Sequence, residues 1–257
     1  YYSNDQYGVL FNKDKTRLIK YAGGNGETSY TIPDTVLYVN GYAFANSPKL
    51  KNVTIPDNVT NVYSYAFLEC RKLESVTIGN GLTEVADYTF YNCTSLKNVV
   101  FGNSVTSIGY QAFYGCNDLE NVVIPENVTT LKERVFEDCS NLEAVLIPKS
   151  ITTISWGVFD ECTDLVEVYY TGTEEQWAAM TIENYNDCLK TAKIHYNADH
   201  IHTYTSVYTA ATCTKKAYYT YTCECGFSYI KEIGEANGHT PVDSGTVTRE
   251  PTCSLEG

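Results

Sequence analysis

The fold is decided by one stretch of the chain, Val53-Thr54-Ile55-Pro56-Asp57-Asn58-Val59-Thr60-Asn61-Val62-Tyr63-Ser64-Tyr65-Ala66-Phe67-Leu68-Glu69-Cys70. Its first three residues alternate apolar, polar and apolar, as in a short strand with one buried face. Pro56 ends this strand because proline cannot donate the next ladder hydrogen bond. A second extended stretch follows at residues 59–62. The segment ending in Ala66-Phe67 is predicted to form a single helical or 3₁₀ turn that directs the phenylalanine inward.

This pattern returns every 23 residues in six copies. One column contains Phe44, Phe67, Phe90, Phe113, Phe136 and Phe159, and three residues later come Ser47, Cys70, Cys93, Cys116, Cys139 and Cys162. Leucine and valine columns follow, from Leu50 to Leu165 and from Val53 to Val168. Because several columns keep one period, the repeat predicts a solenoid whose coils bury their apolar faces against each other. Parallel strands would pair between coils, about 4.8 Å apart.

Both ends of the array depart from the repeat. The turn-rich residues 12–15 separate two apolar stretches and predict a β-hairpin that leads into the first coil. Thr173 followed by Gln176 resembles a capping box, which predicts a short helix near the other end. Trp177 and Met180 lie one turn apart on that helix and are expected to cover the last coil, followed by a final strand at residues 192–196.

A different composition begins at Asp199. Residues 211–217 are echoed at 251–257, and His202-Thr203 recurs as His239-Thr240, so a truncated second copy begins at 239. Residues 218–223 and 227–233 are predicted to form a hairpin. Because the chain begins inside a pattern and ends inside this copy, we expect a fragment of a longer protein. The expected domains are a hairpin at 1–29, six repeats at 30–168, a cap at 169–198 and a small β-rich module at 199–257.

The cysteines fall into two groups with different expected roles. The column from Cys70 to Cys162 is expected to be structural, because stacked side chains point in parallel and do not converge on a metal or on each other. In the tail, Cys213, Cys223 and Cys225 with His202 or His239 could assemble a zinc site. The local spacing is C-x-C rather than the usual C-x₂-C, which weakens that reading. We favour a disulfide from Cys213 to Cys223 or Cys225, or no staple, over zinc.

The composition excludes several classes of function. A net charge of −13 without clusters of Lys and Arg argues against binding to nucleic acid or to an anionic membrane. The sequence contains no apolar run of about 20 residues, so we expect no membrane insertion in this fragment. Catalytic motifs are also missing, so we predict that the chain is not an enzyme and needs no cofactor. His195, His200 and His202 cluster near the junction and are expected to be ordinary surface residues.

The outward position of each V-x-I strand changes character along the array. It is polar at Thr54 and Thr77 and then reads Val100, Val123, Leu146 and Tyr169. An exposed apolar stripe usually marks an interface, so these last four residues are the candidate binding surface. The alternatives are that the cap or tail packs over the stripe, or that β-branched residues merely favour strands there.

The 23-residue unit closely resembles the BspA-like leucine-rich repeats of surface proteins from oral and gut bacteria and some mucosal parasites. Residues 8–16 and 170–177 also resemble segments found with that family. The resemblance covers roughly residues 5–197. It implies a leucine-rich-repeat solenoid, that is, a right-handed superhelix of 23-residue coils with a parallel sheet. It also implies a secreted or cell-surface protein that acts in adhesion.

Two functions therefore remain open at this point. The first is a bacterial adhesion module that binds a host matrix protein or another surface protein through the sheet face, with carbohydrate as a possible ligand. The second is a structural spacer, or a carbohydrate-binding accessory region, within a larger surface enzyme. Fold alone does not decide between them.

Overall fold

The structure, a computed structural model, describes residues 2–22, 26–211, 215–225 and 228–233. The chain divides into two compact units, Tyr1–Ile201 and His202–Gly257. Within the described ranges, no helix combines the length and apolar character needed to cross a bilayer.

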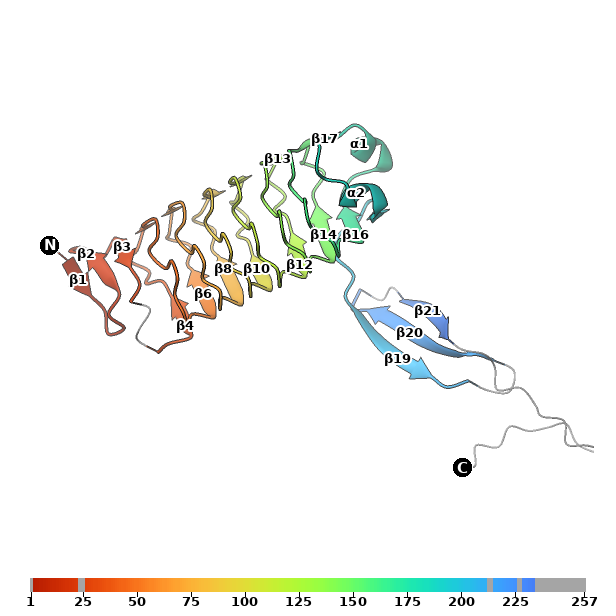
Figure 1. Cartoon of the computed structure of the whole chain (residues 1–257), viewed down its shortest axis with the longest axis horizontal. Coiled ribbons are helices and arrows are strands. Elements are labelled where there is room, and N and C mark those ends of the chain that lie inside the picture. The colour runs from red at the N-terminus through yellow and green to blue at the C-terminus, as the bar shows by residue number, and fades with distance from the viewer. Residues whose placement is uncertain (1, 23–25, 212–214, 226–227, 234–257) are drawn as a thin grey trace, which may run out of the picture. The chain divides into compact units, whose positions relative to one another are not determined.

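The first unit is a solenoid whose coils stack in sequence order (Figure 1). The parallel register places Val76 opposite both Val53 and Val99, so the valine column of the repeat is the core face of a parallel sheet. The strands of this row are β4 (Ser29–Thr31), β6 (Asn52–Ile55), β8 (Ser75–Ile78), β10 (Asn98–Val100), β12 (Asn121–Val123), β14 (Ala144–Ile147), β16 (Glu167–Tyr170) and β18 (Lys193–His195). The predicted parallel solenoid of 23-residue coils is confirmed.

A second row of two-residue strands crosses each coil after the first row. Its members pair in parallel over shorter runs, in separate sheets. They are β5 (Tyr38–Val39), β7 (Asn61–Val62), β9 (Glu84–Val85), β11 (Ser107–Ile108), β13 (Thr130–Leu131), β15 (Thr153–Ile154) and β17 (Thr181–Ile182). The segment that leads from this row to each column phenylalanine is a turn and not the predicted helical turn.

Each of these turns uses two residues with positive φ, which is uncommon outside glycine. The two columns are Tyr42, Tyr65, Tyr88, Gln111, Arg134 and Gly157, and Asn46, Glu69, Asn92, Gly115, Asp138 and Glu161. In this conformation the backbone N–H can point along the solenoid axis; that of Asn92, for example, donates to the Tyr114 carbonyl of the next coil at 2.8 Å. The turns therefore link coils by hydrogen bonds where no strand does.

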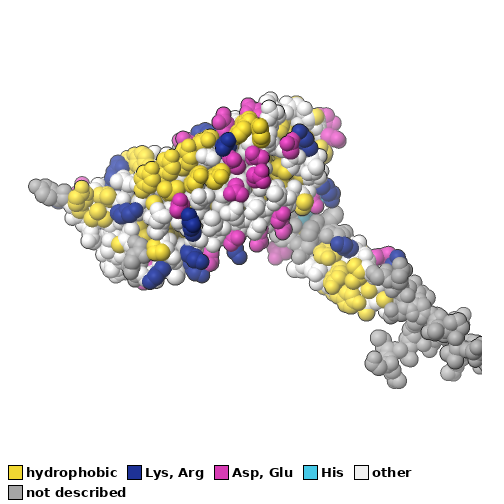
Figure 2. All heavy atoms as spheres, viewed as in Figure 1, with side chains coloured by type: hydrophobic (Ala, Val, Ile, Leu, Met, Phe, Trp, Pro, Cys, Tyr) yellow, Lys and Arg dark blue, Asp and Glu magenta, His cyan; other side chains and the backbone are white. Residues whose placement is uncertain are grey.

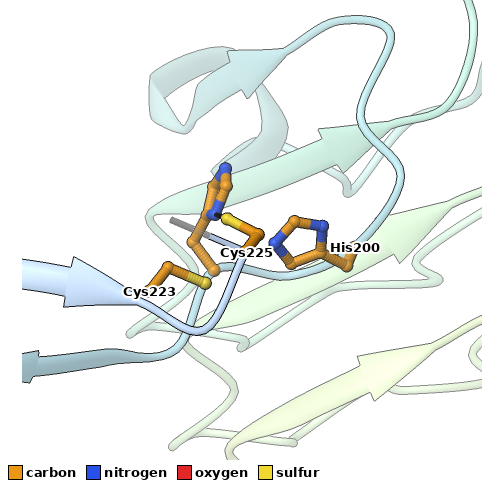
Figure 3. Close-up of side chains that lie close together, drawn as sticks. His200, Cys223 and Cys225 are labelled. Carbon is orange, nitrogen blue, oxygen red and sulfur yellow. Dashed lines mark hydrogen bonds between the residues drawn. The ribbon is translucent and has the colours of Figure 1, made fainter. Parts of the chain in front are cut away.

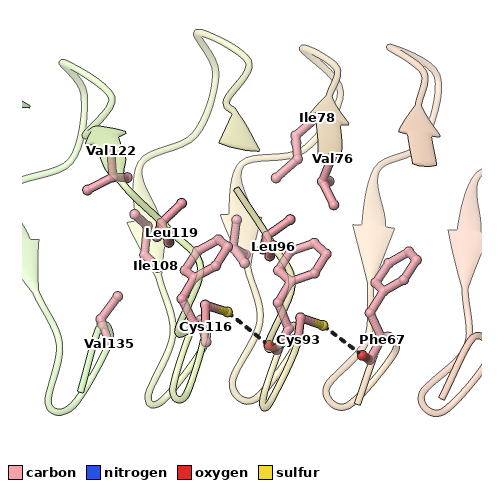
Figure 4. Packing of buried hydrophobic residues seen from close by; sticks show 14 of the residues in the cluster. Phe67, Val76, Ile78, Cys93, Leu96, Ile108, Cys116, Leu119, Val122 and Val135 are labelled. Carbon is pink, nitrogen blue, oxygen red and sulfur yellow. Dashed lines mark hydrogen bonds between the residues drawn. The ribbon is translucent and has the colours of Figure 1, made fainter. Parts of the chain in front are cut away.

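The core is built from stacked copies of the same side chain (Figure 4). The six column phenylalanines are fully buried, and neighbouring rings lie 4.6 to 5.8 Å apart with nearly parallel planes. The column cysteines add a regular hydrogen bond, because each thiol donates to the carbonyl of the phenylalanine 26 residues earlier; the Cys93 Sγ lies 3.2 Å from Phe67 O. The thiol thus adds a second hydrogen bond to a buried carbonyl that already accepts a backbone N–H; Phe67 O, for example, accepts the Cys70 N–H at 3.2 Å.

The N-terminal end contains the predicted hairpin, formed by β2 (Leu10–Asn12) and β3 (Arg17–Lys20), with β1 (Tyr2–Asn4) added antiparallel to β2. This region belongs to the solenoid more fully than its sequence suggests. Strand β3 pairs in parallel with β5, and the Tyr21 ring stacks on Phe44 at 5.0 Å. Tyr21 therefore occupies the phenylalanine column one period before Phe44.

The C-terminal end contains the predicted cap. Helix α1 (Glu174–Ala178) begins with the capping box of Thr173 and Gln176, and Trp177 and Met180 pack against the core. The short helix α2 (Cys188–Thr191) continues the cysteine ladder, because Cys188 Sγ lies 3.4 Å from Phe159 O. The predicted final strand is β18, which pairs in parallel with β16.

The second unit contains an antiparallel sheet of β19 (Tyr204–Thr209), β20 (Ala217–Cys223) and β21 (Ser228–Ile233). Strands β20 and β21 form the hairpin predicted from the sequence. Strand β19, which pairs with β20 over six residue pairs, was not predicted.

Candidate functional site

The outward positions of the V-x-I strands form two blocks, and within each block neighbouring strands pair without a break. The parallel register places Thr54 beside Thr77 and Thr77 beside Val100. In the second block Val123 lies beside Leu146, which lies beside Tyr169, which lies beside His195. The spacing of the sequence therefore aligned these residues correctly on one face.

The expectation that all four apolar members of the stripe are exposed was wrong for two of them. Val100 and Val123 are 57% and 50% exposed, but Leu146 and Tyr169 are only 8% and 4% exposed. Ala198 and Ile201 pack against Leu146 and Tyr169. The chain turns back over the sheet after β18, held by backbone hydrogen bonds from Asn197 to Gly172 and from Ala198 to Tyr170.

His195 contributes to this covering. Its ring stacks on Tyr169 with centroids 4.6 Å apart and planes within 6° of parallel. Its Nε2 also pairs with the Glu167 carboxylate of the neighbouring strand. Both partners lie on β16, so His195 is a packing residue of the cap at this face.

The exposed part of the stripe lines a groove of about 1030 Å³. Val100, Val123 and Leu146 contribute apolar side chains, and charged or polar groups of Glu126, Lys149 and Gln176 also line it. Ala198 and Asp199 belong to the segment that covers the end of the stripe. The remaining lining residues are Val99, Phe101, Asn103, Ile124, Pro125, Pro148, Ser150 and Thr171.

An interruption of the sheet lies beneath this groove. Strand β10 pairs with β8 and β12 pairs with β14, but β10 and β12 belong to separate sheets. Phe101 directly follows β10, at the position where most coils carry isoleucine, and its ring packs edge-on against Phe113 at 5.7 Å. Both strands at the break contribute residues to the groove, so the break in the repeat coincides with the hollow in the surface.

Tyrosines form a second regular feature of the solenoid surface. The rings of Tyr42, Tyr65 and Tyr88 stack at 5.1 and 4.6 Å with planes within 1° and 8° of parallel. Because the rings stack on one another, much of each inner face is occupied.

Figure 2 shows that hydrophobic side chains gather in a band along the solenoid face in view, with Asp and Glu concentrated toward its C-terminal part.

The cysteine column offers little chemistry despite its regularity. Cys70, Cys93, Cys116, Cys139 and Cys162 are buried and form no disulfides. Burial raises the pKa of the Cys93, Cys116, Cys139 and Cys162 thiols well above the ordinary value. Burial also raises the pKa of Cys188 to about 11. Since the thiolate is the reactive form, these side chains act as core filler and hydrogen-bond donors.

Three metal candidates from the tail do come together. His202, Cys223 and Cys225 each offer a ligand atom, and these atoms all lie within 4.8 Å of one another (Figure 3). Cys213 and His239 lie outside the described residues, as does the predicted disulfide from Cys213.

The comparisons identify the family of the solenoid. The sequence profile of the BspA type leucine rich repeat region matches residues 23–143 and 83–211, in six copies. The chain therefore belongs to the BspA-type leucine-rich repeat family. Its fold is a repeat scaffold that supports interactions with proteins and is generally not enzymatic. No curated protein matches the sequence.

Solved bacterial structures show the same fold. A leucine-rich repeat protein from Eubacterium ventriosum is 30% identical with a TM-score of 0.62, covering 80% of this chain and 52% of its own. One from Bacteroides ovatus is 27% identical with a TM-score of 0.59, covering 70% of this chain and 45% of its own. The T. pallidum leucine-rich repeat protein is also 27% identical, with a TM-score of 0.56, and the match covers 65% of this chain and 78% of that one. The chain thus spans about half the length of the first two.

Proposed function

We propose that this chain is a recognition module of a bacterial surface or secreted protein and binds a partner protein in the groove over β10 and β12. The observation that carries the proposal is the position of the groove. It lies where the outward stripe changes from threonine to valine and where the sheet is interrupted. Val100 and Val123 remain at least half-exposed there, although the regular coils bury most of their large apolar side chains.

The chemistry of the groove favours an apolar segment of a protein as its ligand. Val100, Val123 and the edge of Leu146 offer an apolar floor, and Pro125 and Pro148 extend it. Contiguous exposed apolar surface with polar groups around it is typical of protein interfaces. Glu126 and Lys149 supply both signs of charge at the groove, which suits orientation of a polypeptide.

Adhesion is the role that this groove would serve in a surface protein of this family, with a host matrix protein or another bacterial surface protein as partner. Carbohydrate is the less favoured ligand. Sugar rings bind on free aromatic faces, and the inner faces of the partly exposed column of Tyr42, Tyr65 and Tyr88 stack on each other. A passive spacer would not need an exposed apolar hollow at one place in the array.

The test compares two double variants at equivalent positions of the stripe. Val100→Asp with Val123→Asp places charges in the groove, and Thr54→Asp with Thr77→Asp places the same charges at the N-terminal end of the face. Binding is measured on a panel of purified host matrix proteins and on a glycan array. We expect the groove variant to lose binding to a matrix protein by more than about tenfold, and the control variant to keep it.

Unfolding temperatures of both variants accompany the binding measurement. Because the substituted side chains are mostly exposed, both should stay within about 2 °C of the unmodified chain. Equal loss of binding in both variants would contradict the groove as the site. Binding to glycans alone would favour the carbohydrate-binding accessory role, and a lack of binding to either class would favour the spacer.

A further inference from the structure

The start of β19 and the end of β20 bring three ligand-bearing residues of the small module to one place. Tyr204 of β19 pairs with Cys223 of β20 in antiparallel register. Continuing that register by two residues places His202 opposite Cys225. Residues two apart on an extended chain project to the same side, so a C-x-C spacing at a strand end can present both thiols together.

The distances agree with a tetrahedral metal site. Cys225 Sγ and His202 Nδ1 lie 3.5 Å apart. Zinc–sulfur and zinc–nitrogen bonds of normal length, at a tetrahedral angle, place such a pair of ligand atoms about 3.6 Å apart. The ligand atoms of Cys223, Cys225 and His202 all lie within 4.8 Å of one another, which is close enough to converge on one ion.

Figure 3 shows the Cys223 and Cys225 side chains close together at the end of β20. Both thiols belong to the same strand end, so one ion can reach them together with His202.

We propose that Cys223, Cys225 and His202 bind one zinc ion, with two thiolates and one imidazole as ligands. Thiolate and imidazole ligands favour Zn²⁺ over the harder divalent cations. Metal binding releases the two thiol protons, so the site is neutral overall when Zn²⁺ is bound. This reverses the preference from sequence for a disulfide or no staple, because C-x-C at this strand end presents both thiols to His202.

A bound metal also stabilises a module that buries few apolar side chains. Among the module residues whose side chains the structure describes, only Ala217 and Cys223 are buried, while Val207 and Ile230 are 65% and 61% exposed. A sheet of this size with so little apolar burial needs a disulfide, a metal or a partner to stay folded. The proposed zinc joins the segment before β19 to the turn after β20, which closes one end of the sheet.

The experiment uses the full 257-residue chain, purified under reducing conditions, with zinc and cobalt as the probes. Elemental analysis should find about one zinc per chain. Replacement by Co²⁺ should give the strong visible bands of a tetrahedral ion and a thiolate charge-transfer band. Cys225→Ser should weaken zinc binding by more than about tenfold, since loss of an outer hydrogen bond alone already costs that much. Cys116→Ser removes a thiol from the solenoid column and is the matched control, which should bind as the unmodified chain does.

Two results would overturn the proposal. One is a reduced chain that takes up no stoichiometric zinc, and the other is a cobalt thiolate band that survives in the Cys223→Ser, Cys225→Ser double variant.

Discussion

The solenoid and the small module are stabilised in different ways. In the solenoid each coil buries phenylalanine, cysteine, leucine and valine against identical residues of the next coil, so stability grows with the number of neighbours. The module has three strands with long hydrogen-bonded ladders but few buried side chains in its described part. Repetition supplies a core to the first unit, whereas the second depends on a local cross-link. Regular strand pairing by itself does not provide a core.

The largest expected effect is the loss of one ring from the phenylalanine column. Phe113 lies between Phe90 and Phe136, with ring centroids 5.2 and 5.4 Å away. Phe113→Ala leaves a cavity that the flanking coils cannot fill, and should lower the free energy of unfolding by about 3–5 kcal/mol. Denaturant titration checks this, with Val207→Ala on the exposed module surface as the control. Hydrogen exchange should then show weaker protection in the coils around Phe113 and unchanged protection in the module; equal loss in both units would break the comparison.

A smaller effect separates the covered and the open parts of the stripe. Leu146 is buried beneath Ala198 and Ile201, whereas Val123, its partner on the adjacent strand, is half-exposed. Leu146→Asp should therefore cost about 2–3 kcal/mol, from lost apolar burial and from a charge placed under the covering segment. Val123→Asp should stay within about 0.5 kcal/mol. If thermal unfolding shows equal losses at both positions, the covering of Leu146 does not contribute as the structure suggests.

The smallest effect concerns thiol reactivity and separates the two groups of cysteines. Burial raises the pKa of the column thiols Cys93, Cys116, Cys139 and Cys162, so they hold little thiolate at pH 8. In the folded chain, alkylation followed by peptide mass analysis should leave them unmodified, and unfolding should make them react. Cys225 is exposed, so its protection should depend on zinc and disappear with a chelator. Rapid labelling of Cys116 or Cys139 in the folded chain would contradict the structural role of the column.

The raised pKa values also have a consequence for stability at high pH. In the unfolded chain the thiols of Cys93, Cys116, Cys139 and Cys162 ionise near their ordinary pKa of 9.0, while in the folded solenoid burial keeps them protonated at that pH. The unfolded state therefore releases protons first as the pH rises. Stability from the column is complete below that pH and declines above it.

Most of the solenoid could be predicted from the sequence because one spacing sets it. The phenylalanine, cysteine and valine columns required coils of 23 residues, and the capping box of Thr173 and Gln176 located helix α1. The repeat was harder to recognise at the N-terminus, because Tyr21 stands where the other coils have phenylalanine. The coil that contains Tyr21 was therefore not predicted. Strand β19 was missed because residues 204–209 carry no turn signal that marks a hairpin with β20.

The candidate sites were less predictable, since each depends on which segments come together. The sequence determined the scaffold, because identical residues at a fixed spacing can be buried only by stacking coil on coil. It also placed Val100, Val123, Leu146 and Tyr169 on one face through the register of parallel strands. Only the tertiary structure decided that residues 198–201 return over the last two of them, and that an interrupted sheet leaves the first two beside a groove. Strand pairing likewise joined His202 to Cys225, residues 23 positions apart whose meeting depends on the register of β19 against β20.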